Sequence, residues 1–350
     1  MQHPTSMQTI KSLRGIVSQD PAVHLNCRVH QTLALVAART SAADLLYYRS
    51  LYDSYRIFDH CYLRKELRWS YPYPYTEEDS LNRLGFTRES RDRIDLDEFL
   101  ELVSAGISRD EAVSFFAPRA EFEYQADYLD RMGLPRSGFL PHSFLACGVD
   151  RPVTQLLIRD DATDNHEFTD FVVPWRIVRA GWEAAPEQWF TDVLVLHRTE
   201  EAPAGSFADV YGAHVLGLTD EFEMYDLLHD RLAGEHDGWP VYAAPGLNCL
   251  SMLAGARLQF CRFLRHTRHS DRVKETYRRN MKSLCAVLDE ATLNHVARDP
   301  AADDRIKRGL YALKRRETSA LRLLRQEIEK FQDAGIEAVR FPEPATHGSR

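Results

Sequence analysis

The hydrophobic pattern changes period in mid-chain, and this change limits the possible folds more than any other feature of the sequence. Short segments after Gly138 are rich in β-branched and apolar residues and are bounded by Gly, Pro or Asp; they span residues 143–150, 153–160, 166–174 and 192–198. The short links between three of them predict a mainly antiparallel sheet. After a turn at Ala202–Gly205, apolar residues recur at helical spacing over long stretches, which predicts a bundle.

The residues before the sheet are expected to form helices and one aromatic loop. Helical spacing predicts a helix over 29–54, an amphipathic helix over 94–108 that stops at Gly106, and a short helix over 108–116 capped by Ser108. The segment 52–84 contains "WSYPYPYTEED", whose prolines favour a loop. This loop either covers the core or forms one wall of a binding cleft. The fold class is therefore α+β, with N-terminal helices packed on the sheet and a C-terminal helical bundle.

These patterns predict four parts along the chain. Residues 1–20 are expected to be a flexible segment, and 21–212 an α+β domain that carries the chemistry. Residues 213–335 are expected to form the helical domain, in which Asp299-Pro300 separates two long helices. Residues 336–350 are expected to be a disordered tail.

Composition and short motifs exclude several classes of protein. The 350 residues carry 44 basic and 52 acidic side chains, a net charge of −8 with no basic run, so we expect no nucleic-acid partner. No apolar stretch is long enough to span a membrane and the N-terminus does not read as a signal peptide, so we expect a cytoplasmic protein. The six cysteines form no CxxC pair and the histidines no HExxH motif, which argues against a metal site. Nucleotide-binding glycine motifs and GxSxG are absent as well, so no cofactor is expected.

One cysteine occupies a position suited to nucleophilic chemistry. Cys27 precedes a predicted helix in "VHLNCRVHQTLALVA", and a helix N-terminus favours the thiolate. A cysteine nucleophile also needs a base and a group that orients the base. The segment "PHSFLACGVDRPVTQLLIRDDAT" begins a strand with His142, turns, and ends a second strand at Asp160 and Asp161. In an antiparallel pair, the end of the second strand lies beside the start of the first, so His142 and one of these acids should meet.

Other assignments of these residues remain open. Cys27 is alternatively a small buried apolar side chain. His24 and His30 flank it and are rival bases, while His166 could line the same cleft. His60 next to Cys61 is a weaker pair, because adjacent side chains point in different directions.

The order Cys, His, Asp and the His-strand-turn-strand-Asp segment resemble papain-like cysteine enzymes. The pattern is similar to bacterial families that include the bacteriocin leader peptidases, and more closely resembles the butirosin-biosynthesis acyltransferase family. The petrobactin condensing enzyme, which acylates spermidine from a carrier protein, looks like a further relative. The resemblance implies a papain-like core in which Cys27 is the nucleophile, His142 the general base and Asp160 its orienting acid, with Asp161 as the alternative.

The resemblance also implies an activity and partners. The expected reaction moves an acyl group from a phosphopantetheine carrier-protein thioester, through an acyl-cysteine, to an amine or polyamine in natural-product or siderophore-type biosynthesis. Papain has a Gln six residues before its Cys that supports the oxyanion, whereas this chain has Pro21 there; the nearest substitutes are Gln19, Asn26 and the backbone N–H of Cys27. The basic C-terminal helices are either solvated faces or a docking surface for the acidic carrier protein. The alternatives are a papain-like peptidase or amidase that uses water, and a non-catalytic scaffold or binding protein.

Overall fold

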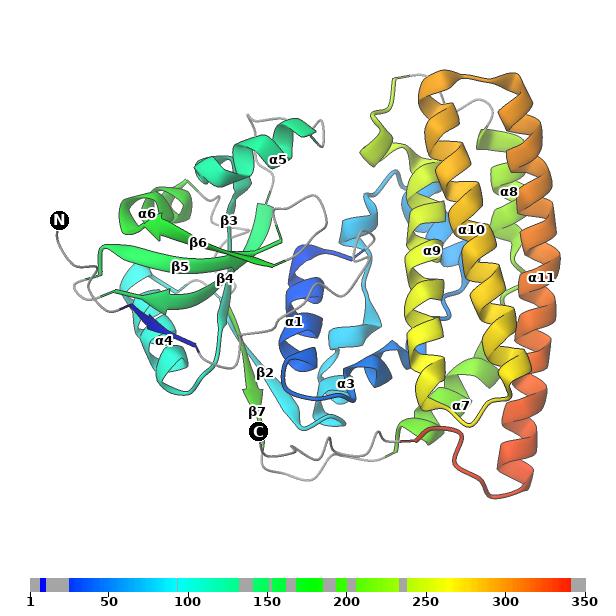
Figure 1. Ribbon diagram of the computed structural model, residues 1–350, viewed down its shortest axis with the longest axis horizontal. Coiled ribbons are helices and arrows are strands. Elements are labelled where there is room, and N and C mark those ends of the chain that lie inside the picture. The colour runs from blue at the N-terminus through cyan, green and yellow to red at the C-terminus, as the bar shows by residue number, and fades with distance from the viewer. Residues whose placement is uncertain are drawn as a thin grey trace, which may run out of the picture. The chain divides into compact units, whose positions relative to one another are not determined.

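The computed structural model describes residues 7–10, 25–92, 94–131, 141–150, 153–161, 168–184, 193–199, 206–232 and 238–340. Its fold class is α+β, as expected, with an antiparallel sheet and long C-terminal helices (Figure 1). Contacts divide the chain into a sheet unit and a helical unit. The sheet unit comprises Met1–Ala22, Cys27–Thr40 and Thr76–Ala204, and the helical unit Val23–Asn26, Ser41–Tyr75 and Gly205–Arg350.

Seven antiparallel strands form the sheet of the first unit. Along the sheet their order is β2 (Phe86–Arg91), β7 (Val193–Arg198), β3 (Val113–Pro118), β4 (Pro141–Val149), β5 (Gln155–Asp160) and β6 (Thr169–Pro174), and β1 (Gln8–Thr9) also pairs with β4. The strands expected within 143–198 are thus present. The expected hairpin is β4 and β5, which pair antiparallel with Leu145 opposite Arg159.

Helices cover this sheet and leave a mainly apolar core between the layers. Helix α1 (Cys27–Ala37) contacts β4. Helices α4 (Leu96–Ser108) and α6 (Trp175–Glu183) bury Phe99 and Val178 against Phe115, Phe144 and Ile158 of the sheet. The shorter helices α3 (Glu78–Asn82) and α5 (Ala126–Arg131) precede β2 and β4 in the chain.

The expectation of a helix over 108–116 was wrong, because α4 ends in a tight return that leads into strand β3. The backbone N–H of Glu111 donates to the carbonyl of Gly106 at 2.8 Å, and Asp110 has φ +61°. Gly106 therefore does not stop the helix, which continues to Ser108. It permits a close approach, since a Cβ there would lie 2.6 Å from the carbonyl oxygen of Glu111. Residues 113–118 then enter the sheet between β7 and β4.

The helical unit contains the long helices expected after residue 205. They are α7 (Phe207–Gly217), α8 (Glu223–Arg231), α9 (Pro245–Phe263), α10 (Asp271–Ala297) and α11 (Pro300–Asp333), and Figure 1 shows α9, α10 and α11 side by side. Asp299 caps α11 by accepting a hydrogen bond from the N–H of Ala301, and Pro300 is its first residue. The break expected at Asp299-Pro300 is therefore present.

Residues 41–75 belong to the helical unit, which differs from the single domain expected over 21–212. The helix expected over 29–54 is interrupted: after α1, a 3-10 helix (Ala43–Arg49) and α2 (Ser54–Phe58) pack on α9. The aromatic segment joins them, with the rings of Tyr47 and Tyr75 edge to face at 5.4 Å. Because Tyr75 is fully buried, the segment covers a core, as the first of its two interpretations proposed.

Both chain ends contain order where the sequence suggested none. Near the N-terminus, Gln8 and Thr9 pair with Val149 and Gly148 of β4. Near the C-terminus, Val339 is buried and forms a β-bridge with Thr267. Residues 1–6 and 11–20 of the expected flexible segment, and residues 341–350, lie outside the described residues.

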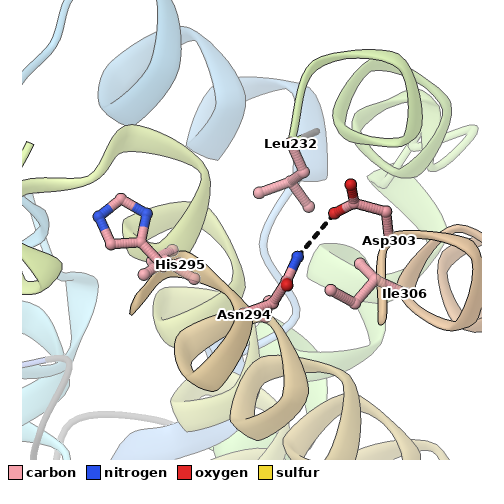
Figure 2. Close-up of a pocket in the computed structure, with 7 residues that line it drawn as sticks. Leu232, Asn294, His295, Asp303 and Ile306 are labelled. Carbon is pink, nitrogen blue, oxygen red and sulfur yellow. Dashed lines mark hydrogen bonds between the residues drawn. The ribbon is translucent and has the colours of Figure 1, made fainter. Parts of the chain in front are cut away.

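Two hollows lie among the described residues of the helical unit. One lies beside Leu232, Asn294 and Asp303 (Figure 2) and measures about 10 Å³, room for a single water. There the side-chain amide of Asn294 donates to Asp303 at 2.6 Å. The other, about 290 Å³, lies between the start of α8 and α11 and is lined by Asp220, Arg322 and Arg325 among others. Among the helices that the structure describes, none combines the length and apolar character needed to cross a membrane.

Candidate active site

Cys27 is the first residue of α1, and its sulfur is held in a polar environment. The backbone N–H of Ser143 donates to its Sγ at 3.2 Å. Burial alone would raise the pKa of Cys27. The charge of His142, a hydrogen bond with it, the Ser143 N–H and the Arg119 guanidinium outweigh burial, so the pKa is lowered from its ordinary value. A lowered pKa increases the thiolate fraction at neutral pH.

The remaining cysteines provide a contrast. Burial raises the pKa of Cys147 in strand β4 and of Cys261 in helix α9 to about 12 each. Cys61 and Cys249 are fully buried in the helical unit. Cys27 is thus the cysteine whose surroundings favour the thiolate, while the sheet cysteine Cys147 and the helix cysteine Cys261 are kept protonated.

His142 and Asp160 meet as the hairpin predicts. The distance from His142 Nε2 to Asp160 Oδ1 is 2.7 Å, and both side chains are almost completely buried. Burial and the nearby Arg119 lower the pKa of His142, but the Asp160 carboxylate and the Cys27 sulfur outweigh them and raise it to about 9. Asp160 is itself held by the hydroxyl of Tyr124 at 3.0 Å and by the amide of Gln125. The carboxylate therefore has a fixed position from which it can orient His142.

The alternative acid, Asp161, pairs mainly with another histidine. Its Oδ2 lies 3.0 Å from Nδ1 of His30, whereas its Oδ1 is 3.8 Å from Nε2 of His142. Burial works against the ionised form of Asp161, but the contact with His30 and the nearby His142 and Arg119 hold its pKa well below the usual range. The shorter contact favours Asp160 as the partner of His142. His30, the rival base one turn after Cys27, uses its Nδ1 on Asp161.

Arg119 is a member of the cluster that sequence reasoning missed. It follows strand β3, whose Ala117 pairs with His142, and this pairing brings the arginine beside the imidazole. Its Nη2 contacts Nδ1 of His142 and lies 3.3 Å from Nε2. Its guanidinium also lies over the ring of Tyr128, 4.5 Å from the centroid. Since β3 was expected to be part of a helix, the sequence offered no signal for this contact.

A buried polar network supports the strand that carries His142. The Gln31 amide donates to the carbonyl of Ser143 at 2.5 Å, and its oxygen accepts from the hydroxyls of Ser143 and Ser114. Gln31 lies one turn after Cys27 on α1, so the network ties the start of the helix to strands β3 and β4. Sequence reasoning missed this residue also; its helical spacing from Cys27 was the available signal.

Other predicted residues lie outside the described part of the chain or belong to the helical unit. Gln19, His24 and His166 lie outside the described residues. Asn26 is half-buried just before α1 and groups by its contacts with the helical unit. His60 turns to Glu66 and the carbonyl of Leu67, and its neighbour Cys61 contacts Met252. The contact with Glu66 places His60 in the packing of the helical unit.

His142, Asp160 and Asp161 also have a donor set that could hold a metal ion. Their ligand atoms lie within 4.8 Å of one another. A divalent cation there would face the permanent positive charge of Arg119 and would have to displace the contact between His142 and Asp160. The arrangement fits a thiolate and its base better than it fits a cation.

In comparisons with known proteins, neither a family model nor a curated protein matches this chain.

Proposed function

We propose that this protein is a cysteine-dependent N-acyltransferase with a papain-like core. The Cys27 thiolate attacks the carbonyl carbon of an acyl thioester, and the C–S bond to the donor breaks as the departing thiolate takes a proton from His142 and leaves as a thiol. An amine then attacks the acyl-Cys27, His142 removes its proton, and the thiolate leaves as the amide forms. Asp160 holds His142 in the orientation that both steps need.

One observation carries this proposal. Residues more than a hundred positions apart, at the start of α1 and at the start of β4, meet around a sulfur atom whose pKa is lowered although burial opposes it. A buried cysteine with only a structural role would have its pKa raised, as that of Cys147 is. The hydrogen bond between His142 and Asp160 supplies the remaining element of a thiolate-imidazolium pair.

The donor we propose is a carrier protein, as in the butirosin-type acyltransferases that the sequence resembles. Its docking surface would be the basic stripe, which we define as Arg308, Arg315 and Arg322 of α11. These three arginines are exposed and seven residues apart, so they lie on one face of the helix. Tyr311 lies between the first two and is 60% exposed. A positive stripe of this kind complements the acidic surface of a carrier protein.

Intact-mass spectrometry tests the first half of the reaction. The protein is mixed with an acyl-loaded carrier protein, and we expect a mass increase of one acyl group that Cys27→Ala abolishes and Cys261→Ala retains. Addition of a polyamine such as spermidine should discharge the acyl group as an amide. Release of the free acid alone, or cleavage of a peptide panel without amide formation, would instead identify a hydrolase.

A further inference from the structure

The guanidinium of Arg119 contacts His142 in a way that only one protonation state of His142 permits. An arginine is always protonated and carries only donors, so its contact with Nδ1 needs a free lone pair there. His142 must then carry its proton on Nε2, from which it donates to Asp160. In this state the imidazole is neutral, which is the form that exists above the pKa of His142 near 9.

The thiolate-imidazolium pair needs a different arrangement. His142 is then protonated on both nitrogens, and the Nδ1–H would face the N–H donors of Arg119. Two donors and two positive charges in contact repel each other. Arg119 therefore has to leave Nδ1 when His142 takes the proton of Cys27. Asp160, Asp161 and Tyr128 are the charged and titratable groups that otherwise act on Arg119.

The acyl substrate provides a destination for the displaced guanidinium. When the thiolate attacks a thioester, negative charge develops on the carbonyl oxygen, and preorganised donors near that oxygen stabilise the transition state. Arg119 is close enough to Cys27 for its charge to act on the thiol, and it already lies on the other reacting group.

We propose that Arg119 is the oxyanion donor of this site, and that the guanidinium, displaced from His142 Nδ1 by the thiolate-imidazolium pair, moves to the substrate oxygen when an acyl group is bound. Arg119 would then be a catalytic residue, since it contacts the carbonyl oxygen of the tetrahedral intermediate. This inference rests on the proposed cysteine chemistry but not on the identity of the acceptor, because an amine and water both require the same intermediate.

Two reactions of Cys27 separate the roles of Arg119. Alkylation by iodoacetamide needs the thiolate but creates no oxyanion. Protection of Cys27 by an N-acetylated amino aldehyde depends on a tetrahedral adduct whose oxygen occupies the oxyanion position. We expect Arg119→Gln to alkylate at a rate within about threefold of the wild type, and to need roughly a hundredfold more aldehyde for half-protection. A small acyl-pantetheine thioester should acylate it slower by a similar factor.

Control variants make the result decisive. Arg28, the residue after Cys27 in the chain, is also positively charged, and its guanidinium packs over the ring of Phe116 at 4.0 Å. If Arg28→Gln loses as much aldehyde protection as Arg119→Gln, the effect is one of overall charge and the inference fails. It also fails if Arg119→Gln binds the aldehyde normally, or loses alkylation and protection equally. A wild-type Cys27 that is alkylated no faster than Cys261 would instead refute the cysteine chemistry itself.

Discussion

Replacing Asp160 with asparagine tests the electrostatics of the site most directly. Asp160 is the largest influence that raises the pKa of His142, which stands at about 9 against an ordinary 6.5 although burial and Arg119 oppose the rise. That rise corresponds to about 3 kcal/mol in favour of the imidazolium. Asparagine keeps the shape of the side chain but removes the charge, so the pKa of His142 should fall to its ordinary value or below.

The loss should appear as a change in the pH profile of Cys27 alkylation. In the wild type, the thiolate-imidazolium pair exists between the lowered pKa of Cys27 and the pKa of His142 near 9. In Asp160→Asn the pair is no longer favoured, so alkylation by iodoacetamide at pH 7 should slow roughly a hundredfold and recover only at alkaline pH. Acylation by a thioester should also fall above pH 9 in the wild type, because the departing thiol then lacks a proton donor.

A matched control is the neighbouring carboxylate. Asp161→Asn removes the same charge 3.8 Å from His142, but leaves the 2.7 Å contact of Asp160 intact, so its effect should be less than tenfold. An Asp160→Asn profile that overlays the wild type would refute the assignment. If Asp161→Asn instead causes the larger loss, Asp161 is the orienting acid. Asp160→Asn should also cost about 1–3 kcal/mol of stability, because Tyr124 and Gln125 donate to the same oxygen.

Three further outcomes are expected. Glutamate at all three positions of the basic stripe should raise KM for a carrier-bound acyl donor about tenfold at low salt, and leave the KM of an acyl-pantetheine thioester unchanged. Gln31→Ala should lower the free energy of unfolding in urea by about 2–3 kcal/mol, since it removes the acceptor that the buried hydroxyls of Ser114 and Ser143 share and the donor to the Ser143 carbonyl, and leaves the two hydroxyls only each other. The exposed Gln326→Ala should change it by less than about 0.5 kcal/mol. Dialysis against EDTA should leave Cys27 alkylation and acyl transfer unchanged, and a loss that Zn²⁺ restores would contradict the metal-free interpretation of the cluster.

The sequence predicted the elements whose patterns are local. The β4–β5 hairpin follows from two short β-rich segments on either side of a Gly and Asp turn, and the long helices follow from sustained 3.6-residue spacing. Strand β3 was missed because residues 113–117 form a nearly continuous buried run, which does not alternate and cannot be told from a short helix by its period. The error extended to the site, since Arg119 is positioned by the pairing of β3 with β4.

The sequence could not decide between Asp160 and Asp161, because the answer depends on one irregularity in the hairpin. At the turn Val149 lies opposite Leu156, but beyond Cys147 the register shifts so that Ala146 lies opposite Ile158. Cys147 is therefore an extra residue, a β-bulge. Side chains alternate between the two faces, so one inserted residue exchanges the faces of everything beyond it.

That exchange determines which acid can reach the histidine. With the bulge, Leu145 lies opposite Arg159, so the same register places Asp160 opposite Phe144. His142 is two residues before Phe144 and therefore lies on the same face of the sheet as Phe144 and Asp160. Without the bulge, the register at the turn would place Asp160 opposite Leu145, on the face away from His142, and Asp161 would take its place. The bulge at Cys147 thus accounts for the 2.7 Å contact of His142 with Asp160 and leaves Asp161 free to pair with His30. Two consecutive acids thus serve two histidines: Asp160 ends the strand against His142, and Asp161, the next residue, pairs with His30 at 3.0 Å while its other oxygen lies 3.8 Å from His142.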